Sequence, residues 1–163
     1  MPTACPEASG ATLLRISVQD PRWSLIAFEN AAEHACREAL SASGMAWREF
    51  EIDVLACADS RMAALNEEFR GHCRPTNVLS WPVDSSIPEF PGMAAPLGNI
   101  AIAYDSCMRE SREQGVDALA HATHLVLHGC MHLLGYGHEN DAEAEIMERL
   151  ERDILATLGL AIS

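Results

Sequence analysis

The stretch from Val116 to His138, VDALAHATHLVLHGCMHLLGYGH, contains five of the chain's seven histidines within a long apolar helix pattern. Apolar residues fill most positions between the histidines, and Gly135 follows the last apolar pair. We therefore expect a helix from Val116 to Leu134 that ends at Gly135. With 3.6 residues per turn, four of the histidines lie within roughly 80° of one another on this helix: His121, His124, His128 and His132.

The spacing of His128 and His132, four residues apart, allows two imidazoles on one helix face to bind a single metal ion. The helix cannot supply a third ligand by continuing, because the next residue on that face lies a full turn away. Gly135 adopts a left-handed turn at low cost, and the chain can then return to deliver His138. The sequence thus predicts one zinc-type ion per chain, bound by His128, His132 and His138. Three neutral imidazoles with an open fourth position are typical of a catalytic zinc site.

The string H-G-C-M-H-L-L-G-Y-G-H has the spacing of the metzincin peptidase pattern, with Gly129 where those enzymes carry a general-base glutamate. A zinc peptidase therefore stays open as an alternative, but it would need another base. His121 and His124 are too far from the returning loop to join the metal, so we interpret them as supporting or packing residues. Cys130 lies about 200° around the helix from His128 and should face the core.

The composition indicates one globular domain over residues 1–163, with residues 1–10 expected to be loosely ordered. Hydrophobic residues make up 48% and charged residues 21% of the chain, and no apolar run is long enough to span a membrane. The N-terminal stretch lacks the basic and apolar regions of a signal peptide, so we expect a cytoplasmic protein. A net charge of −13, with arginine as the only cation, opposes long-range attraction of nucleic acid. Any RNA binding must therefore depend on a local site.

The six cysteines show no C-x-x-C pair. In an intracellular chain this pattern is typical of small buried hydrophobic residues and disfavours a disulfide framework or a zinc ribbon.

Periodicity and turn residues predict an α+β fold, with a sheet of about four strands in mixed orientation packed by helices. The predicted strands cover 13–18, 50–56, 77–81 and 97–104. The predicted helices cover 24–40, 59–69, 105–114, 116–134 and 141–158. We expect Ile26, Ala27, Ala31 and Ala35 to face the core from the first helix, Asp59 or Ser60 to cap the second, and Asn140 to cap the last. In that last helix we expect an apolar stripe of Ile146, Leu150, Ile154 and Leu158.

Three segments together resemble the YbeY family of bacterial rRNA maturation factors. The first is the histidine string, the second is Phe69-Arg70-Gly71 followed by PTNVLSWP at 75–82, and the third is LGNIAI at 97–102. The histidine string alone is moderately specific, and the second segment makes the resemblance strong. The matching segments cover most of residues 50–155.

This resemblance implies a zinc-dependent endoribonuclease specific for single strands, which acts in 3′-end maturation of small-subunit rRNA and in ribosome quality control. Its partners would be single-stranded RNA, ribosomal RNA or the small ribosomal subunit, with no DNA and no membrane. Carried over by position, His128, His132 and His138 are the zinc ligands, and Arg70 is the functional arginine. For Arg74, the two interpretations, a contact with the RNA backbone and a solvated surface position, are evenly balanced.

Two positions depart from the family pattern, because Asn99 stands where an aspartate is usual and Gly137 replaces a common acidic residue. Both changes remove negative charge, which we expect to alter the surroundings of the metal. With no glutamate at 129, the nucleophile is either a water activated by the metal or the RNA 2′-hydroxyl. A metal-binding, ribosome-associated factor without cleavage activity is the remaining alternative.

Overall fold

The computed structural model describes residues 12–71, 76–83, 93–137 and 139–160. Four strands form one open sheet in the order β1-β2-β4-β3. The strands are β1 (Leu14–Val18), β2 (Phe50–Cys57), β3 (Val78–Pro82) and β4 (Ala95–Ala103). β1, β2 and β4 are mutually parallel, and β3 runs antiparallel to β4 at the edge. This confirms the predicted α+β class and the mixed four-stranded sheet.

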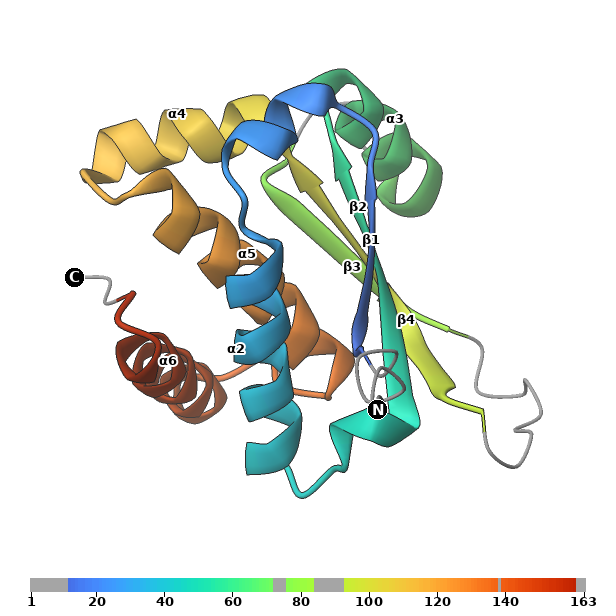
Figure 1. Ribbon diagram of the computed structural model, residues 1–163, viewed down its shortest axis with the longest axis vertical. Helices are drawn as coiled ribbons and strands as arrows, with labels where there is room; N and C mark the ends of the chain where they lie inside the picture. Colours follow the sequence, from blue (N-terminus) through green and yellow to red (C-terminus); the bar gives the residue numbers. More distant parts are fainter. Residues whose placement is uncertain (1–11, 72–75, 84–92, 138, 161–163) are drawn as a thin grey trace, which may run out of the picture.

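The helices pack on both faces of this sheet (Figure 1). They are α2 (Glu29–Ala42), α3 (Asp59–Arg70), α4 (Tyr104–Gln114), α5 (Ala118–Leu133) and α6 (Asp141–Thr157), with 3₁₀ turns η1 (Pro21–Leu25) and η2 (Trp47–Glu49). Figure 1 shows α2, α5 and α6 on one side of the sheet and α3 on the other. No helix in the described ranges is both long and apolar enough to cross a lipid bilayer.

Alternating residues of β4 supply the two hydrophobic clusters that hold these layers together. Ile100 and Ile102 point into the larger cluster with α2, α5 and α6. Ala101 and Ala103 point into the smaller cluster beneath α3. This alternation is the ordinary geometry of a strand buried on both faces, and it fixes α5 and α3 on opposite sides of the sheet.

The first helix begins later than the predicted 24–40. Trp23 and Phe28 are both fully buried, with ring centroids 5.2 Å apart. The chain must turn between them, and Ala27 adopts a positive φ of 54° there, so α2 starts only at Glu29. The expected core positions were therefore wrong in part, because Ala27 is exposed and Ala31 is only half-buried. The buried residues of α2 are Ala32, Ala35, Cys36, Ala39 and Leu40.

The predicted N-cap residues of α3 and α6 can be compared with the structure. Ala58 occupies the N-cap of α3, because the Asp59 carboxylate accepts hydrogen bonds from the Ser106 N–H and hydroxyl instead. The predicted cap was therefore wrong for α3. For α6 it is confirmed, since Asn140 Oδ1 accepts a hydrogen bond from the Glu143 N–H at 2.9 Å.

Two glycines let α5 and β3 approach β4 closely. A Cβ atom added at Gly129 would lie 3.1 Å from Ile100 Cγ2, so the absence of a side chain allows α5 to rest directly on the sheet. A Cβ atom at Gly98 would lie 2.7 Å from the Trp81 carbonyl oxygen and 2.6 Å from Leu133 Cδ2. The two glycines therefore set the separation between the histidine helix and strand β3.

We expect Gly98→Ala to lower the free energy of unfolding by about 1–3 kcal/mol, because the new methyl group must displace backbone as well as side-chain atoms. Urea denaturation followed by circular dichroism measures this loss. Ser17→Ala in the exposed part of β1 is the control and should be close to neutral. Equal stability of Gly98→Ala and the parent protein would show that the close approach is not a real constraint.

Candidate functional site

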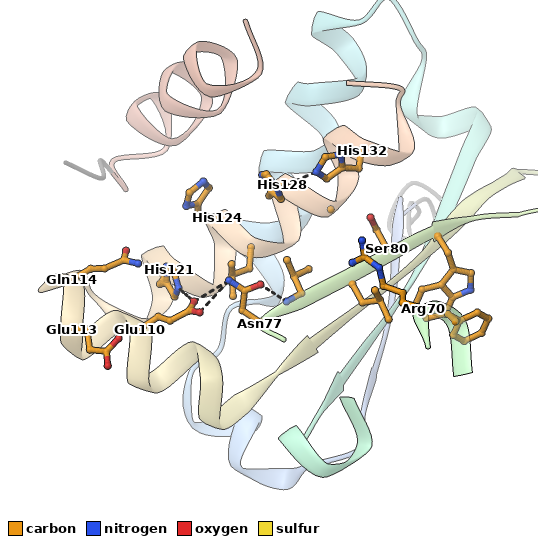
Figure 2. A pocket seen from close by; sticks show the side chains of 16 residues that line it. Arg70, Asn77, Ser80, Glu110, Glu113, Gln114, His121, His124, His128 and His132 are labelled. Atoms are coloured by element: carbon orange, nitrogen blue, oxygen red, sulfur yellow. Dashed lines mark hydrogen bonds and ion pairs between the residues drawn. The ribbon is translucent and has the colours of Figure 1, made fainter. Parts of the chain in front are cut away.

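A groove of about 920 Å³ runs between α5 and the edge strand β3 (Figure 2). One wall carries four histidines of α5, and the other carries β3 residues together with the last turn of α3. The lining side chains of greatest chemical interest are His121, His124, His128, His132, Arg70, Asn77, Ser80, Trp81, Phe69 and Glu110. The structure thus brings Arg70 and the histidine face, which lie far apart in the sequence, into one groove.

His128 and His132 direct the same ring nitrogen at one point. Their Nε2 atoms are 3.0 Å apart, and their ring centroids are 4.6 Å apart. The spacing of four residues on α5 produces this convergence, as expected from the sequence. Two nitrogen lone pairs at this distance repel each other unless a proton or a cation lies between them.

The Nδ1 atoms of both rings are held by acceptors, which fixes the tautomer. His128 Nδ1 donates to Glu151 Oε2 at 2.7 Å. His132 Nδ1 donates to the Tyr136 carbonyl oxygen at 3.1 Å. A carboxylate and a carbonyl can only accept here, so each neutral ring keeps its proton on Nδ1 and has a lone pair on Nε2. This arrangement is common for histidines that bind metals in proteins.

Glu151 is a functional candidate that the sequence analysis missed. It comes from α6, is 5% exposed, and also accepts a hydrogen bond from His124 Nε2 at 3.0 Å. Burial raises its pKa, but the hydrogen bonds from His124 and His128 outweigh burial and lower the pKa to about 2. The side chain is therefore an ionised carboxylate that supports two histidines of the groove.

The register of α6 explains why Glu151 was missed. The predicted apolar stripe was wrong at Ile146, which is 54% exposed. The buried face instead carries Met147, Glu151, Ile154 and Leu155. A glutamate four residues from both a buried methionine and a buried leucine was the available signal.

The separation of His128 Nε2 and His132 Nε2 is compatible with two ligands of one zinc ion. Two nitrogens bound to a tetrahedral zinc at about 2.0–2.1 Å lie about 3.3–3.4 Å apart, close to the observed separation. His138, the third predicted ligand, lies outside the described residues. Within the described ranges, no group of three histidine, cysteine or acidic side chains is arranged to hold a metal.

His121 belongs to a separate network at the other end of the groove. It is buried, and its Nε2 lies 2.8 Å from Glu110 Oε1. Asn77 Nδ2 donates to the same carboxylate at 3.0 Å, which connects the start of β3 to α4 and α5. Figure 2 shows this cluster well separated from His132 along α5. The network holds the two walls of the groove together.

The outer edge of β3 faces the groove and is closed at both ends. Hydrogen bonds from Ala103 N to Asn77 O and from Val83 N to Leu97 O show that odd-numbered residues of β3 pair with β4, so Val78, Ser80 and Pro82 face outward. Asn77 Oδ1 accepts the Val78 N–H at 2.6 Å, and Pro82 has no N–H. Of these outward positions, Ser80 is left with an N–H directed at the groove.

Arg70 ends α3 and lies on the same wall as Ser80, as Figure 2 shows. The helix stops there because Gly71 adopts the left-handed conformation, with φ of 77°. Arg70 is exposed, and it is the only arginine among the described residues that line the groove. Its guanidinium is therefore available to an anionic ligand. Arg74 lies outside the described residues.

The cysteines of the described segments do not belong to this site. Cys36, Cys57, Cys107 and Cys130 are free and buried, which confirms the prediction for these four and for the inward position of Cys130. Burial raises the pKa of the Cys57 thiol to about 11 and that of Cys107 to about 12, so both remain protonated. Cys5 and Cys73 lie outside the described residues.

Comparison with known proteins gives the groove a family context. The family model described as endoribonuclease YbeY matches residues 16–159. An endoribonuclease YbeY from Dinoroseobacter shibae is 42% identical, over 98% of this chain and 94% of the relative. The chain belongs to the YbeY endoribonuclease family. A YbeY from Paracoccus denitrificans is 45% identical over 89% of this chain and 86% of its own length.

The fold is also found among solved structures. A Thermotoga maritima protein known from its solution structure aligns with a TM-score of 0.58, at 21% identity over 90% of this chain and 92% of that one. At this identity the likeness supports the fold alone.

One of the two departures from the YbeY pattern lies away from the groove. Asn99 pairs with Trp81 across the strands, and it shares the α3 side of the sheet with Ala101. The side chain is therefore on the opposite face from His128 and His132, so Asn99 does not lie beside these two rings. Gly137 precedes His138, and a Cβ atom there would lie 3.3 Å from Glu143 Oε1, so a larger side chain would need that carboxylate to shift slightly.

Proposed function

We propose that this protein is a zinc-dependent endoribonuclease that cleaves single-stranded RNA and acts in 3′-end maturation of small-subunit rRNA in the cytoplasm. The observation that carries the proposal is the convergence of His128 Nε2 and His132 Nε2 across the groove from Arg70. His138 would complete a three-histidine site for one zinc per chain. Ribosome quality control and docking on the small subunit follow from the family resemblance as parts of the same proposal.

Cleavage of a phosphodiester places extra negative charge on the non-bridging oxygens. Arg70 can hold two of these oxygens through its planar pair of donors, and the Ser80 N–H can donate to the phosphate from the same wall. When bound, zinc would supply a Lewis acid beside the phosphate. The protein's own contribution is to position the RNA between Arg70 and the histidine face.

Glu151 and the Tyr136 carbonyl keep the two imidazoles ready for this role. Because both fix the proton on Nδ1, neither ring has to change tautomer or rotate when the metal binds. The carboxylate of Glu151 also offsets part of the positive charge of the ion. A ligand pair held in a fixed orientation in this way supports catalysis better than two freely rotating side chains.

Two features disfavour the peptidase alternative. Position 129 is glycine, so the general-base glutamate of the metzincin pattern is missing, and a Cβ atom there would already lie 3.1 Å from Ile100 Cγ2. A peptide substrate pairs with an exposed strand through several backbone groups, and Asn77 and Pro82 remove outward donors from β3.

The test offers the purified protein an unstructured RNA and, separately, a denatured protein, each with and without a chelator. We expect internal cleavage of the RNA alone, lost with the chelator and restored by zinc. Cleavage of the denatured protein would support the peptidase, and binding of RNA without cleavage would support the non-catalytic factor. The end groups of the products identify the nucleophile, since a 2′,3′-cyclic phosphate requires the RNA 2′-hydroxyl.

RNA binding should depend only weakly on salt. The net charge is −13, and Arg70 is the only arginine among the described residues that line the groove, so few phosphates can be neutralised. With about two or three phosphate contacts, log affinity should fall against log salt with a slope of about −1.4 to −2.1. Fluorescence anisotropy of labelled RNA over a salt series measures the slope. A slope steeper than about −5 would reveal an extended basic surface beyond the groove and contradict binding by a few local contacts.

A further inference from the structure

An exposed aromatic pair lies at the Arg70 end of the groove. The rings of Phe69 and Trp81 are stacked, with centroids 4.8 Å apart and an interplanar angle of 21°. Both residues line the groove, and Phe69 immediately precedes Arg70 in the last turn of α3. Neither ring has a part in the proposed cleavage chemistry.

Phe69 is 49% exposed, and it is the only aromatic residue among the large apolar side chains exposed in the described part of the chain. Trp81 covers one face of its ring, so the exposed surface lies on the other face and the edge. Trp81 itself is partly buried against the smaller hydrophobic cluster beneath α3. The pair is therefore a braced platform with one flat apolar face open.

The charges of the groove restrict where a nucleic acid backbone can lie. Arg70 is at the platform end, whereas Glu110 and Glu113 line the opposite end and repel phosphate. A chain held by so few ionic contacts needs another source of affinity. Stacking of a base on an aromatic side chain contributes about 1–3 kcal/mol and does not depend on phosphate charge.

We infer that Phe69, braced by Trp81, is a nucleobase-binding subsite that stacks one unpaired base of the RNA next to the phosphate held by Arg70. This inference rests on the proposed function. It accounts for preference for single strands, because a base in a duplex is already stacked on its neighbours and cannot offer a free face. Recognition by stacking alone tolerates any of the four bases.

The test combines variants of Phe69 with an RNA of about eight unpaired nucleotides in which each base in turn is removed to leave an abasic ribose. Anisotropy is read on the as-purified protein before cleavage begins, and the integrity of the RNA is checked afterwards. Phe69→Leu keeps an apolar side chain and removes the flat face. Phe69→Tyr preserves the face, and Ile146→Ala removes an exposed apolar side chain of α6, away from the groove lining.

We expect Phe69→Leu to weaken binding of the intact RNA by about 5- to 150-fold, while Phe69→Tyr and Ile146→Ala bind normally. One abasic position should cause a similar loss with the parent protein and little further loss with Phe69→Leu, because both changes remove the same contact. Additive losses at every position would overturn the subsite. Undiminished RNA binding by Phe69→Leu would also overturn the subsite. It would favour contact of the Phe69–Trp81 pair with a protein partner instead.

Failure of the subsite can be distinguished from failure of the proposed function. If the parent protein neither binds nor cuts the RNA, the endoribonuclease proposal fails and the subsite fails with it. If it cuts RNA normally but shows additive losses, only the subsite is wrong. A melting temperature within about 2 °C of the parent establishes that each variant is folded.

Discussion

His132→Ala should lose the metal and RNA cleavage together while the fold remains. His132 Nε2 is one of the two nitrogens that converge on the proposed ion. We expect metal content to fall from about one ion per chain to below about 0.1, and cleavage to fall to background. Elemental analysis and single-turnover cleavage of unstructured RNA measure the two losses. His128→Ala should behave in the same way.

A thermal melt with added zinc separates loss of metal from loss of folding. Zinc at about 100 times its dissociation constant should stabilise the parent protein by about 2.7 kcal/mol and leave His132→Ala unchanged. Glu151→Gln should lie between them, with metal affinity weakened by about 10- to 100-fold, because the carboxylate only orients a ligand. His34→Ala removes an exposed histidine of α2 and should retain the ion. Full metal occupancy in His132→Ala would refute the assignment.

Arg70→Ala should keep the metal and the fold and still lose cleavage. The guanidinium contacts the scissile phosphate in our proposal, so its removal affects the transition state and not the histidines. We expect single-turnover cleavage to fall by about two orders of magnitude or more, the range for loss of a preorganised charge donor. Arg70→Lys should recover little, because an ammonium group cannot form the planar pair of hydrogen bonds.

Arg61→Ala is the matched control for Arg70. Arg61 is exposed on the same helix and does not line the groove, so its loss should leave cleavage unchanged. Cleavage by Arg70→Ala at the parent rate would remove this arginine from the site. Loss of the metal or a lower melting temperature would instead make its role structural.

The sheet was predictable because its strands are marked by local patterns. β2 alternates apolar and acidic residues up to Val54, β4 is apolar from Ile100 to Ala103, and β3 ends at Pro82. The start of α2 was not predictable in this way. It depends on burial of Trp23 against Tyr104, which is 81 positions away in the sequence, and such a contact overrides helix propensity.

The candidate site also combines residues that local sequence patterns predict with residues that only long-range packing brings in. The histidine face is local in the sequence, so spacing alone places His128 and His132 on one side of α5. Glu151 contacts the histidines from α6 and Ser80 lines the groove from β3, and each looks like an ordinary polar residue of a helix or strand. Only the packing of α6 and β3 beside α5 gives them a role.

The closed ends of β3 also affect how copies of the protein meet one another. An unprotected strand at the edge of a sheet is a template for aggregation, since a second molecule can add its own strand. Asn77 occupies one outward donor and Pro82 eliminates another, so no continuous ladder can form along this edge. With a net charge of −13 adding mutual repulsion, we expect little self-association through the β3 edge even at high concentration.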